Sequence, residues 1–154
     1  MSAPVSAGRE LRPGTSAPTA ASIAPGLQDK VVFVTGGGRG LGAAISNALG
    51  ATGARIVVAD LNDANAQSVA AAIEGNGGRA RAVALDIGDE DAVRTVIDGV
   101  VEGYGRLDVL INNAGIDFTL PLEELSVAQW DAVMRTNLRG PFLLSKYAVP
   151  VMRR

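Results

Sequence analysis

Short apolar runs alternate with helical stretches over most of the chain, and this alternation constrains the fold more than any other feature. The apolar runs, each expected to be a strand, cover residues 31–35, 54–60, 81–85 and 107–112. The expected helices cover residues 40–53, 63–75 and 89–105, and a last helix starts at Ser126. Strands that alternate with helices indicate βαβ units and a parallel sheet. We therefore predict an α/β fold, a Rossmann-type doubly wound parallel sheet that is incomplete, with four βα units and the later strands absent.

Two of the expected helices carry further signals. Leu41, Ile45 and Leu49 lie four residues apart in the first helix, which predicts one apolar face. Ser126 is followed three residues later by Gln129, the pattern of a capping box at a helix start.

The chain divides into two parts by composition. Residues 1–28 are rich in Ala, Pro and Ser, and we expect a disordered leader there. Residues 29–154 are the predicted Rossmann domain, which we expect to be truncated in the helix after the fourth strand. The leader lacks the apolar run of a secretory signal, so we expect a cytoplasmic protein. Arg9 and Arg12 leave a transit peptide open, although Glu10 argues against it.

Composition excludes several kinds of chemistry. The chain has no Cys and no His, so thiolate catalysis, Ser-His nucleophiles and zinc bound through these residues are impossible, and we expect no metal site. The net charge is -2, which argues against nucleic acid as a partner. No apolar stretch approaches the roughly 18 residues that a membrane span needs, and no membrane association is expected.

A glycine-rich turn directly follows the first strand. Gly38, Gly40 and Ala43 satisfy the generic dinucleotide fingerprint at the start of a helix. Glycine lets the backbone approach a pyrophosphate, and the helix amides favour the anion. Asp60 ends the second strand 18 residues after Gly42, where the fingerprint expects an acid that binds the adenosine ribose.

At these residues the chain resembles the short-chain dehydrogenase/reductase family, in the group whose loop is T-G-x-x-x-G-x-G. Thr35, Gly36, Gly40 and Gly42 fit that loop. Asp86-Ile87 stands where the family contacts adenine, and Asn112-Asn113-Ala114-Gly115 matches its N-N-A-G. The resemblance implies one catalytic residue in this chain, Asn137, which in the family helps to hold a water. The cofactor-binding residues expected in all are Thr35, Gly36, Arg39, Gly40, Leu41, Gly42, Asp60, Leu61, Asp86, Ile87, Asn112, Asn113, Ala114 and Gly115.

Each of these matches also has a structural alternative. Asp86 could cap the next helix, and the two asparagines could be turn formers. Asn137 could satisfy backbone groups in the middle of a helix.

The cofactor expected is NAD, with NADP the less favoured choice. A carboxylate at Asp60 binds a ribose 2′-hydroxyl and repels a 2′-phosphate, and position 61 is Leu rather than Arg. Arg39 argues for the phosphate instead.

The family's catalytic Ser and Tyr-x-x-x-Lys are not found in this chain. Asp108 stands four residues after Tyr104, and Val151 stands four after Tyr147. The adjacent Ser145, Lys146 and Tyr147 match no catalytic position of the family and are interpreted as ordinary helix residues.

The resemblance implies hydride transfer between nicotinamide and an alcohol or carbonyl substrate, by a homo-oligomer, in the complete enzyme. We expect the 154-residue chain alone to be inactive and to self-associate through its apolar last helix. The alternative is a non-catalytic dinucleotide-binding module, acting as a sensor or partner subunit.

Overall fold

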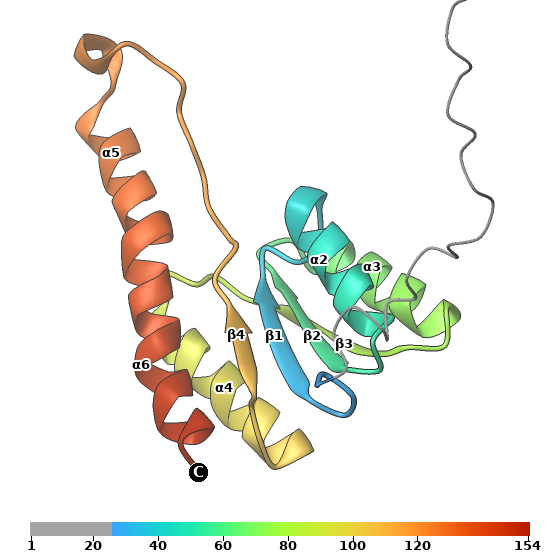
Figure 1. Ribbon diagram of the computed structural model, residues 1–154. Helices are drawn as coiled ribbons and strands as arrows, with labels where there is room; N and C mark the ends of the chain where they lie inside the picture. The colour runs from blue at the N-terminus through green and yellow to red at the C-terminus, as the bar shows by residue number, and fades with distance from the viewer. Residues whose placement is uncertain (1–25) are drawn as a thin grey trace, which may run out of the picture.

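The computed structural model describes residues 26–154 and contains one parallel sheet (Figure 1). Its strands lie in the order β3-β2-β1-β4, and every neighbouring pair is parallel. The bounds are Val31–Thr35 for β1, Arg55–Asp60 for β2, Arg79–Ala84 for β3 and Val109–Ile111 for β4. The crossover order confirms the predicted Rossmann-type α/β fold.

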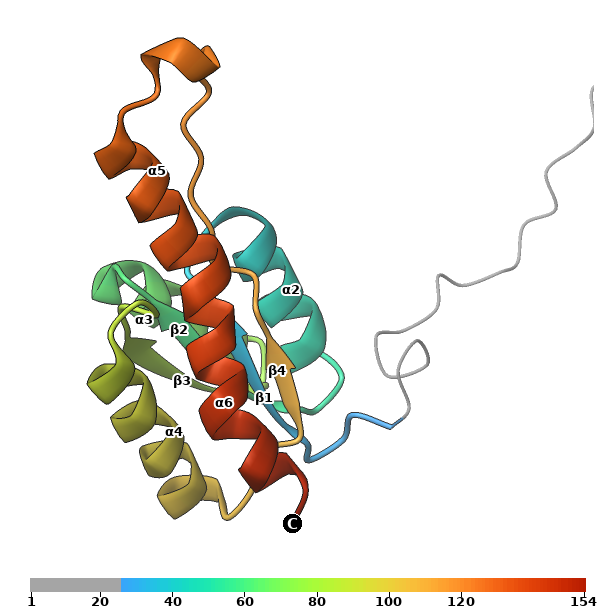
Figure 2. The ribbon, with the colours of Figure 1, turned by 90° about the vertical axis from the view of Figure 1, so that its left-hand side faces the viewer.

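Helices cover both faces of the sheet (Figures 1 and 2). The first pair is α2, Gly40–Gly50, and α3, Asp63–Gly75, which lie together on one face. The other face is covered by α4, Glu90–Tyr104, and α6, Gly140–Met152. A short 3-10 turn, η1 at Leu122–Glu124, precedes α5 at Val127–Met134. The capping box predicted at Ser126 is confirmed at the start of α5.

Two apolar cores form because side chains of the strands alternate between the faces. Along β1, Val31 and Phe33 enter the core under α4 and α6. Val32 and Val34 enter the core under α2 and α3. All four are fully buried, as expected for a central strand with helices on both sides.

The apolar face expected for α2 is partly wrong. Leu41 is 71% exposed, whereas Gly42, Ser46 and Gly50 are buried. The helix lies so close to its neighbours that only small residues fit. A β-carbon on Gly50, for example, would lie 2.7 Å from the side chain of Ile73.

The chain from Val127 to Met152 is helical throughout, with a π-helical segment, η2 at Arg135–Arg139, between α5 and α6. Its inner face places Leu143, Leu144 and Ala148 in the core. Its outer face exposes large apolar side chains along its whole length: Val127, Trp130, Met134, Leu138, Phe142, Val149 and Met152. We call these residues the apolar stripe.

The predicted leader lies mostly outside the described residues, which begin at Gly26. Of its last residues, Leu27 packs against the core under α2 and α3. Among residues 26–154, no helix is long and apolar enough to cross a membrane.

The start of β4 is joined to the start of β1 through Asp108. Its carboxylate accepts a hydrogen bond from the Val31 amide at 2.9 Å, and ion-pairs with Lys30 at 3.3 Å and with Arg106. Burial alone would raise the pKa of Asp108, but the bonds from Arg106, Val31 and Lys30 outweigh it, so the pKa lies below its usual value. A lowered pKa means that the ionised carboxylate stabilises the folded chain.

We expect Asp108→Asn to lower the free energy of unfolding at pH 7 by about 1.5 kcal/mol, because it removes charge-assisted hydrogen bonds. The stabilisation by Asp108 is present at neutral pH and is lost as the pH falls through the lowered pKa. The deficit of the variant should therefore shrink below about pH 4. Urea unfolding at several pH values measures it. Asp91→Asn, which breaks an exposed ion pair with Arg94, is the matched control and should cost less than about 0.5 kcal/mol. Equal effects of the two variants would contradict this account.

Candidate functional site

The turn after β1 brings three stretches of backbone into contact. Gly36 has a φ of 59°, and a β-carbon on it would lie 2.9 Å from the Cα of Ala114. A β-carbon on Gly42 would lie 2.0 Å from the carbonyl oxygen of Gly36. A side chain at either position would force these segments apart, so both glycines are required for the turn to close.

Thr35 and Asn113 connect the ends of β1 and β4. The buried Thr35 hydroxyl accepts hydrogen bonds from the amides of Asn113 and Ala114, both at 3.1 Å, and donates one to the carbonyl of Ile111. The Asn113 side chain donates to the carbonyls of Thr35 and Gly36, at 3.0 and 3.1 Å. Both side chains are therefore engaged inside the protein, and their part in a site is to fix the turn.

The N-terminus of α2 differs from those of α3, α4 and α5, each of which is capped by a side chain. Asn62 caps α3, Asp89 caps α4 and Ser126 caps α5. No side chain of residues 26–154 caps α2. Its first amides are free to meet an anion, which the helix dipole favours. Gly40 has a φ of 52°, and no atom lies within 4 Å of the position its β-carbon would take, so the backbone is open here.

Asp60 stands at the end of β2 beside the turn and is 8% exposed. Its two carboxylate oxygens accept hydrogen bonds from the amides of Gly38 and Asn62, both at 3.0 Å. A carboxylate has about four acceptor positions, so Asp60 can still accept a bond from a hydroxyl group in the cleft.

Asp86 follows β3 and forms an ion pair with Arg135, which the sequence did not predict. Arg135 donates to its two carboxylate oxygens at 3.1 and 2.8 Å, and the Gly88 amide donates at 2.9 Å. The bonds from Arg135 lower the pKa of Asp86 most, burial opposes them, and the Gly88 amide adds to the lowering. Asp89 caps α4, so the capping alternative for Asp86 does not hold.

Asn137 lies in the π-helical segment η2 and is bonded to a different part of the chain. Its amide accepts from the Ile116 amide and donates to the Ile116 carbonyl, both at 2.9 Å. The side chain thus satisfies backbone groups, as in the structural alternative. The groups belong to the segment after β4 and not to the helix that contains Asn137. At the end of η2, the Gly140 amide bonds to the carbonyl of Arg135, five residues back. π-Helical turns of this kind often occur at functional sites.

A cleft of about 810 Å³ opens at the carboxyl ends of the strands, where ligands bind in open α/β sheets. Most of the predicted cofactor residues line it: Gly36, Arg39, Gly40, Leu41, Gly42, Asp60, Leu61, Asp86, Ile87, Asn113, Ala114 and Gly115. Thr35, Asn112 and Asn137, which were also predicted, lie outside its wall. The wall also contains residues that the prediction missed: Leu85, Ile116, Ala132, Arg135 and Thr136.

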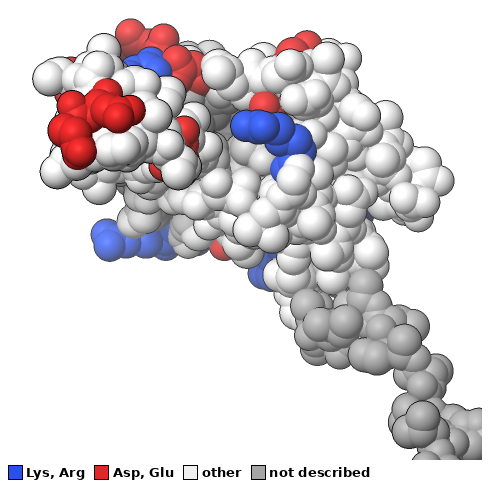
Figure 3. All heavy atoms as spheres, turned by 90° about the horizontal axis from the view of Figure 1, so that it is seen from above, with Lys and Arg blue, Asp and Glu red and all other residues white. Residues whose placement is uncertain are grey.

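Figure 3 looks down on this end of the molecule. Acidic side chains gather over η1, which contains Glu123 and Glu124, at the far end from the glycine-rich turn (Figures 1 and 3). An anion at the turn is therefore well separated from this acidic group.

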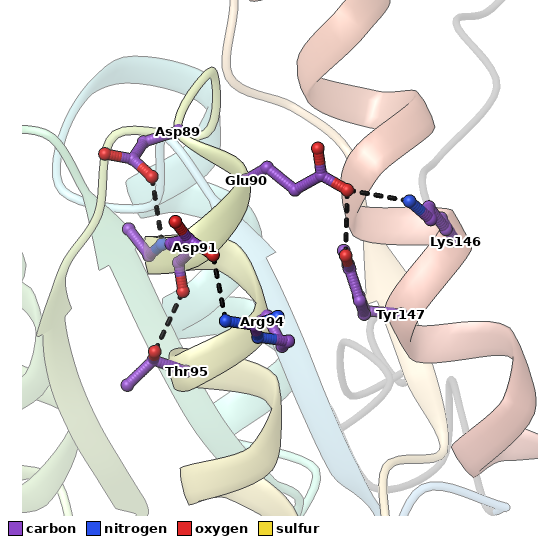
Figure 4. Close-up of polar contacts among 8 residues, drawn as sticks. Asp89, Glu90, Asp91, Arg94, Thr95, Lys146 and Tyr147 are labelled. Atoms are coloured by element: carbon purple, nitrogen blue, oxygen red, sulfur yellow. Dashed lines mark hydrogen bonds and ion pairs between the residues drawn. The ribbon is translucent and has the colours of Figure 1, made fainter.

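Lys146 and Tyr147 lie on α6 and both contact α4 (Figure 4). The Lys146 ammonium and the Tyr147 hydroxyl donate to the same carboxylate oxygen of Glu90, at 2.7 and 2.8 Å. Neither side chain lines the cleft, and Tyr104 does not line it either. Their geometry fits a connection between two helices.

The chemistry of the cleft fits a dinucleotide. The open backbone and free amides at α2 suit a pyrophosphate, and Asp60 suits a ribose. The apolar Leu61 and Ile87 offer surface to a flat base.

We expect Asn113→Asp to lower the free energy of unfolding by about 3 kcal/mol, because a carboxylate would face two carbonyl oxygens in place of an amide donor. Asn112→Asp is the control, since Asn112 is exposed, and should change stability by less than about 0.5 kcal/mol. Denaturant unfolding of both variants checks this, and equal stabilities would refute the assigned role of Asn113.

Comparisons with known proteins agree with this site. A family model for short chain dehydrogenase matches residues 30–154. D-threitol dehydrogenase of Mycolicibacterium smegmatis is 42% identical over 118 residues, which are 77% of this chain and 45% of that protein. The 3-oxoacyl-[acyl-carrier-protein] reductase of Thermotoga maritima is 36% identical over 126 residues, 82% of this chain and 51% of that protein. The chain thus spans about half the length of these relatives.

The solved structures include a metagenomic short-chain oxidoreductase in complex with NADP. It has a TM-score of 0.78 and 40% identity, and the match covers 82% of this chain and 57% of that one. Family members bind NAD(P), and the cleft described above is built from the residues of the matched region. The chain belongs to the short-chain dehydrogenase family of oxidoreductases.

Proposed function

We propose that this chain binds NAD for an oxidoreductase that acts on an alcohol or carbonyl substrate. The observation that carries the proposal is the uncapped N-terminus of α2, which opens into the cleft beside the engaged carboxylate of Asp60. When bound, the nicotinamide would accept or donate a hydride. The chain's own residues would hold and orient it.

Each part of the cleft has a role in this proposal. The amides of Gly40, Leu41 and Gly42 would hold the pyrophosphate, and Asp60 would accept from the adenosine ribose. Asp86 and Ile87 would contact the adenine. Asn113, with Ala114 and Gly115 in the same motif, would keep the turn and the wall of the cleft in place. Asn137 would act as a catalytic residue only through its backbone, because its side chain is bonded to Ile116.

NAD is favoured over NADP because the carboxylate of Asp60 would repel a 2′-phosphate. This carboxylate is anchored by two amides, so it could not turn away from a phosphate without losing both bonds. Arg39 also lines the cleft and supports NADP as the second candidate, the cofactor present in the solved relative.

We further propose that the 154-residue chain binds the cofactor without turning over substrate. A tyrosine base must reach the substrate and have its pKa lowered by a neighbour. Tyr147 is bonded to Glu90 on the other side of the sheet from α2, and Tyr104 packs against the same core. Neither can act on a ligand in the cleft.

The apolar stripe supports a homo-oligomer. Trp130 is 52% exposed and Phe142 is 62% exposed on the same outer face of the long helix. Monomeric proteins seldom leave contiguous apolar surface of this kind in water.

Calorimetric titration of the purified chain should show saturable NAD binding and weaker binding of NADP. Asp60→Ala should weaken NAD binding about tenfold to a hundredfold, because it removes a charge-assisted bond to the ribose. Arg39→Gln should weaken NADP binding more than NAD binding. Asp63→Ala, an exposed acid at the start of α3, is the control and should bind as the parent does. A folded chain that binds neither nucleotide would overturn the proposal.

Size-exclusion chromatography with light scattering should find the chain self-associated. Phe142→Glu should shift it towards monomer, because a charge in the apolar stripe opposes burial. Leu61→Glu, at a leucine that is more exposed than Phe142 and lies outside the stripe, should leave the association unchanged. A parent chain that stays monomeric at every concentration would contradict this prediction.

A further inference from the structure

Asp86 and Ile87 are both held in place by the π-helical segment η2 and the residue after it. Arg135, the first residue of the segment, binds the Asp86 carboxylate through two nitrogens. Gly140 directly follows the segment and packs against Ile87, where a β-carbon would lie 2.5 Å from the Ile87 Cδ1 atom. One short stretch of helix therefore supports both neighbours at the end of β3.

The position of the Arg135 guanidinium is also fixed by Gly88. A β-carbon on Gly88 would lie 2.5 Å from the Cζ atom of Arg135, so the absence of a side chain makes room for the guanidinium. Gly88 is buried, and its amide bonds to the same carboxylate that Arg135 binds. The carboxylate, the guanidinium and the glycine backbone form one packed unit at the cleft.

The middle of η2 is hydrogen-bonded to the segment that follows β4, the strand at the other edge of the sheet. Asn137 holds both backbone groups of Ile116, in the segment that follows β4. Because β3 and β4 are the two edges of this sheet, η2 connects opposite sides of the cleft. Ile116 and Arg135 both line it.

We propose that Arg135 is a positioning residue, which orients the Asp86 carboxylate for the base of the nucleotide. Through η2, binding of the nucleotide at Asp86 would also stabilise the segment that contains Ile116. This inference rests on the proposed NAD-binding function. Three of the roughly four acceptor positions of the carboxylate are used by Arg135 and the Gly88 amide. The remaining one is left for an amino group in the cleft, and a carboxylate that cannot rotate loses less entropy on binding.

The planar fork of arginine is essential to this role. A lysine would keep the positive charge near Asp86 but could not bind both oxygens in a fixed plane. Replacement by lysine therefore separates orientation of the carboxylate from simple charge compensation.

The test is calorimetric titration with ADP-ribose, which has the adenine, ribose and pyrophosphate but no nicotinamide. Arg135→Gln should weaken binding about fivefold, the effect expected for a partly exposed ion pair. Arg135→Lys should not restore it. Arg94→Gln is the matched control, because Arg94 is also an exposed and ion-paired arginine but lies on α4. This variant should bind as the parent does. Should Arg135→Gln fail to fold, Gly88→Ala gives a second way to displace the guanidinium.

Two further measurements distinguish orientation from a general structural effect. In a chain that already carries Asp86→Asn, adding Arg135→Gln should weaken ADP-ribose binding little further, since the partner of Arg135 is already altered. Amide exchange at residues 115–118 should slow when ADP-ribose binds to the parent chain, and this slowing should disappear in Arg135→Gln.

Parent-like binding by Arg135→Gln, rescue by lysine, or an undiminished effect in the Asp86→Asn background would each overturn the inference while the proposed function stands. A folded parent chain that does not bind ADP-ribose would overturn both.

Discussion

The turn after β1 depends on a contact between backbone segments that only glycine allows. Gly36 lies against Ala114, and Gly42 lies against the carbonyl of Gly36. Thr35 and Asn113 fix this contact with hydrogen bonds that connect β1, the turn and the end of β4. The same packing places the free amides of α2 at the cleft. These motif residues therefore hold the turn in its conformation, and the free backbone amides at the start of α2 are the groups that a ligand can bind.

Much of the fold could be predicted from the sequence, because strand alternation and helix caps are local signals. β1 and α3 have the predicted bounds, and Ser126 with Gln129 forms the predicted cap. The buried face of α2 could not be predicted by periodicity, since close packing rather than apolar area selects its small residues. The cleft residues that belong to a spacing motif were found, whereas Arg135 was missed because its partner Asp86 is 49 positions away.

Two surfaces remain without a partner in the described part of the chain. β4 pairs with β1 alone and is an edge of the sheet, and the outer face of the long helix has the apolar stripe. Exposed strand edges and apolar faces both promote association. No side chain of the apolar stripe lines the cleft, so a substitution in the stripe can change association without altering a cleft residue.

Amide hydrogen exchange with and without NAD shows which part of the chain the cofactor contacts. We expect NAD to slow exchange at residues 39–42, 60–61 and 113–116, which line the cleft at the carboxyl ends of the strands. A second hollow, lined by Gln28, Asn47, Gly53 and Gly77 at the opposite end of the sheet, should be unaffected. Slowing confined to that opposite hollow, or no slowing anywhere in a folded chain, would rule out NAD binding at the carboxyl ends of the strands.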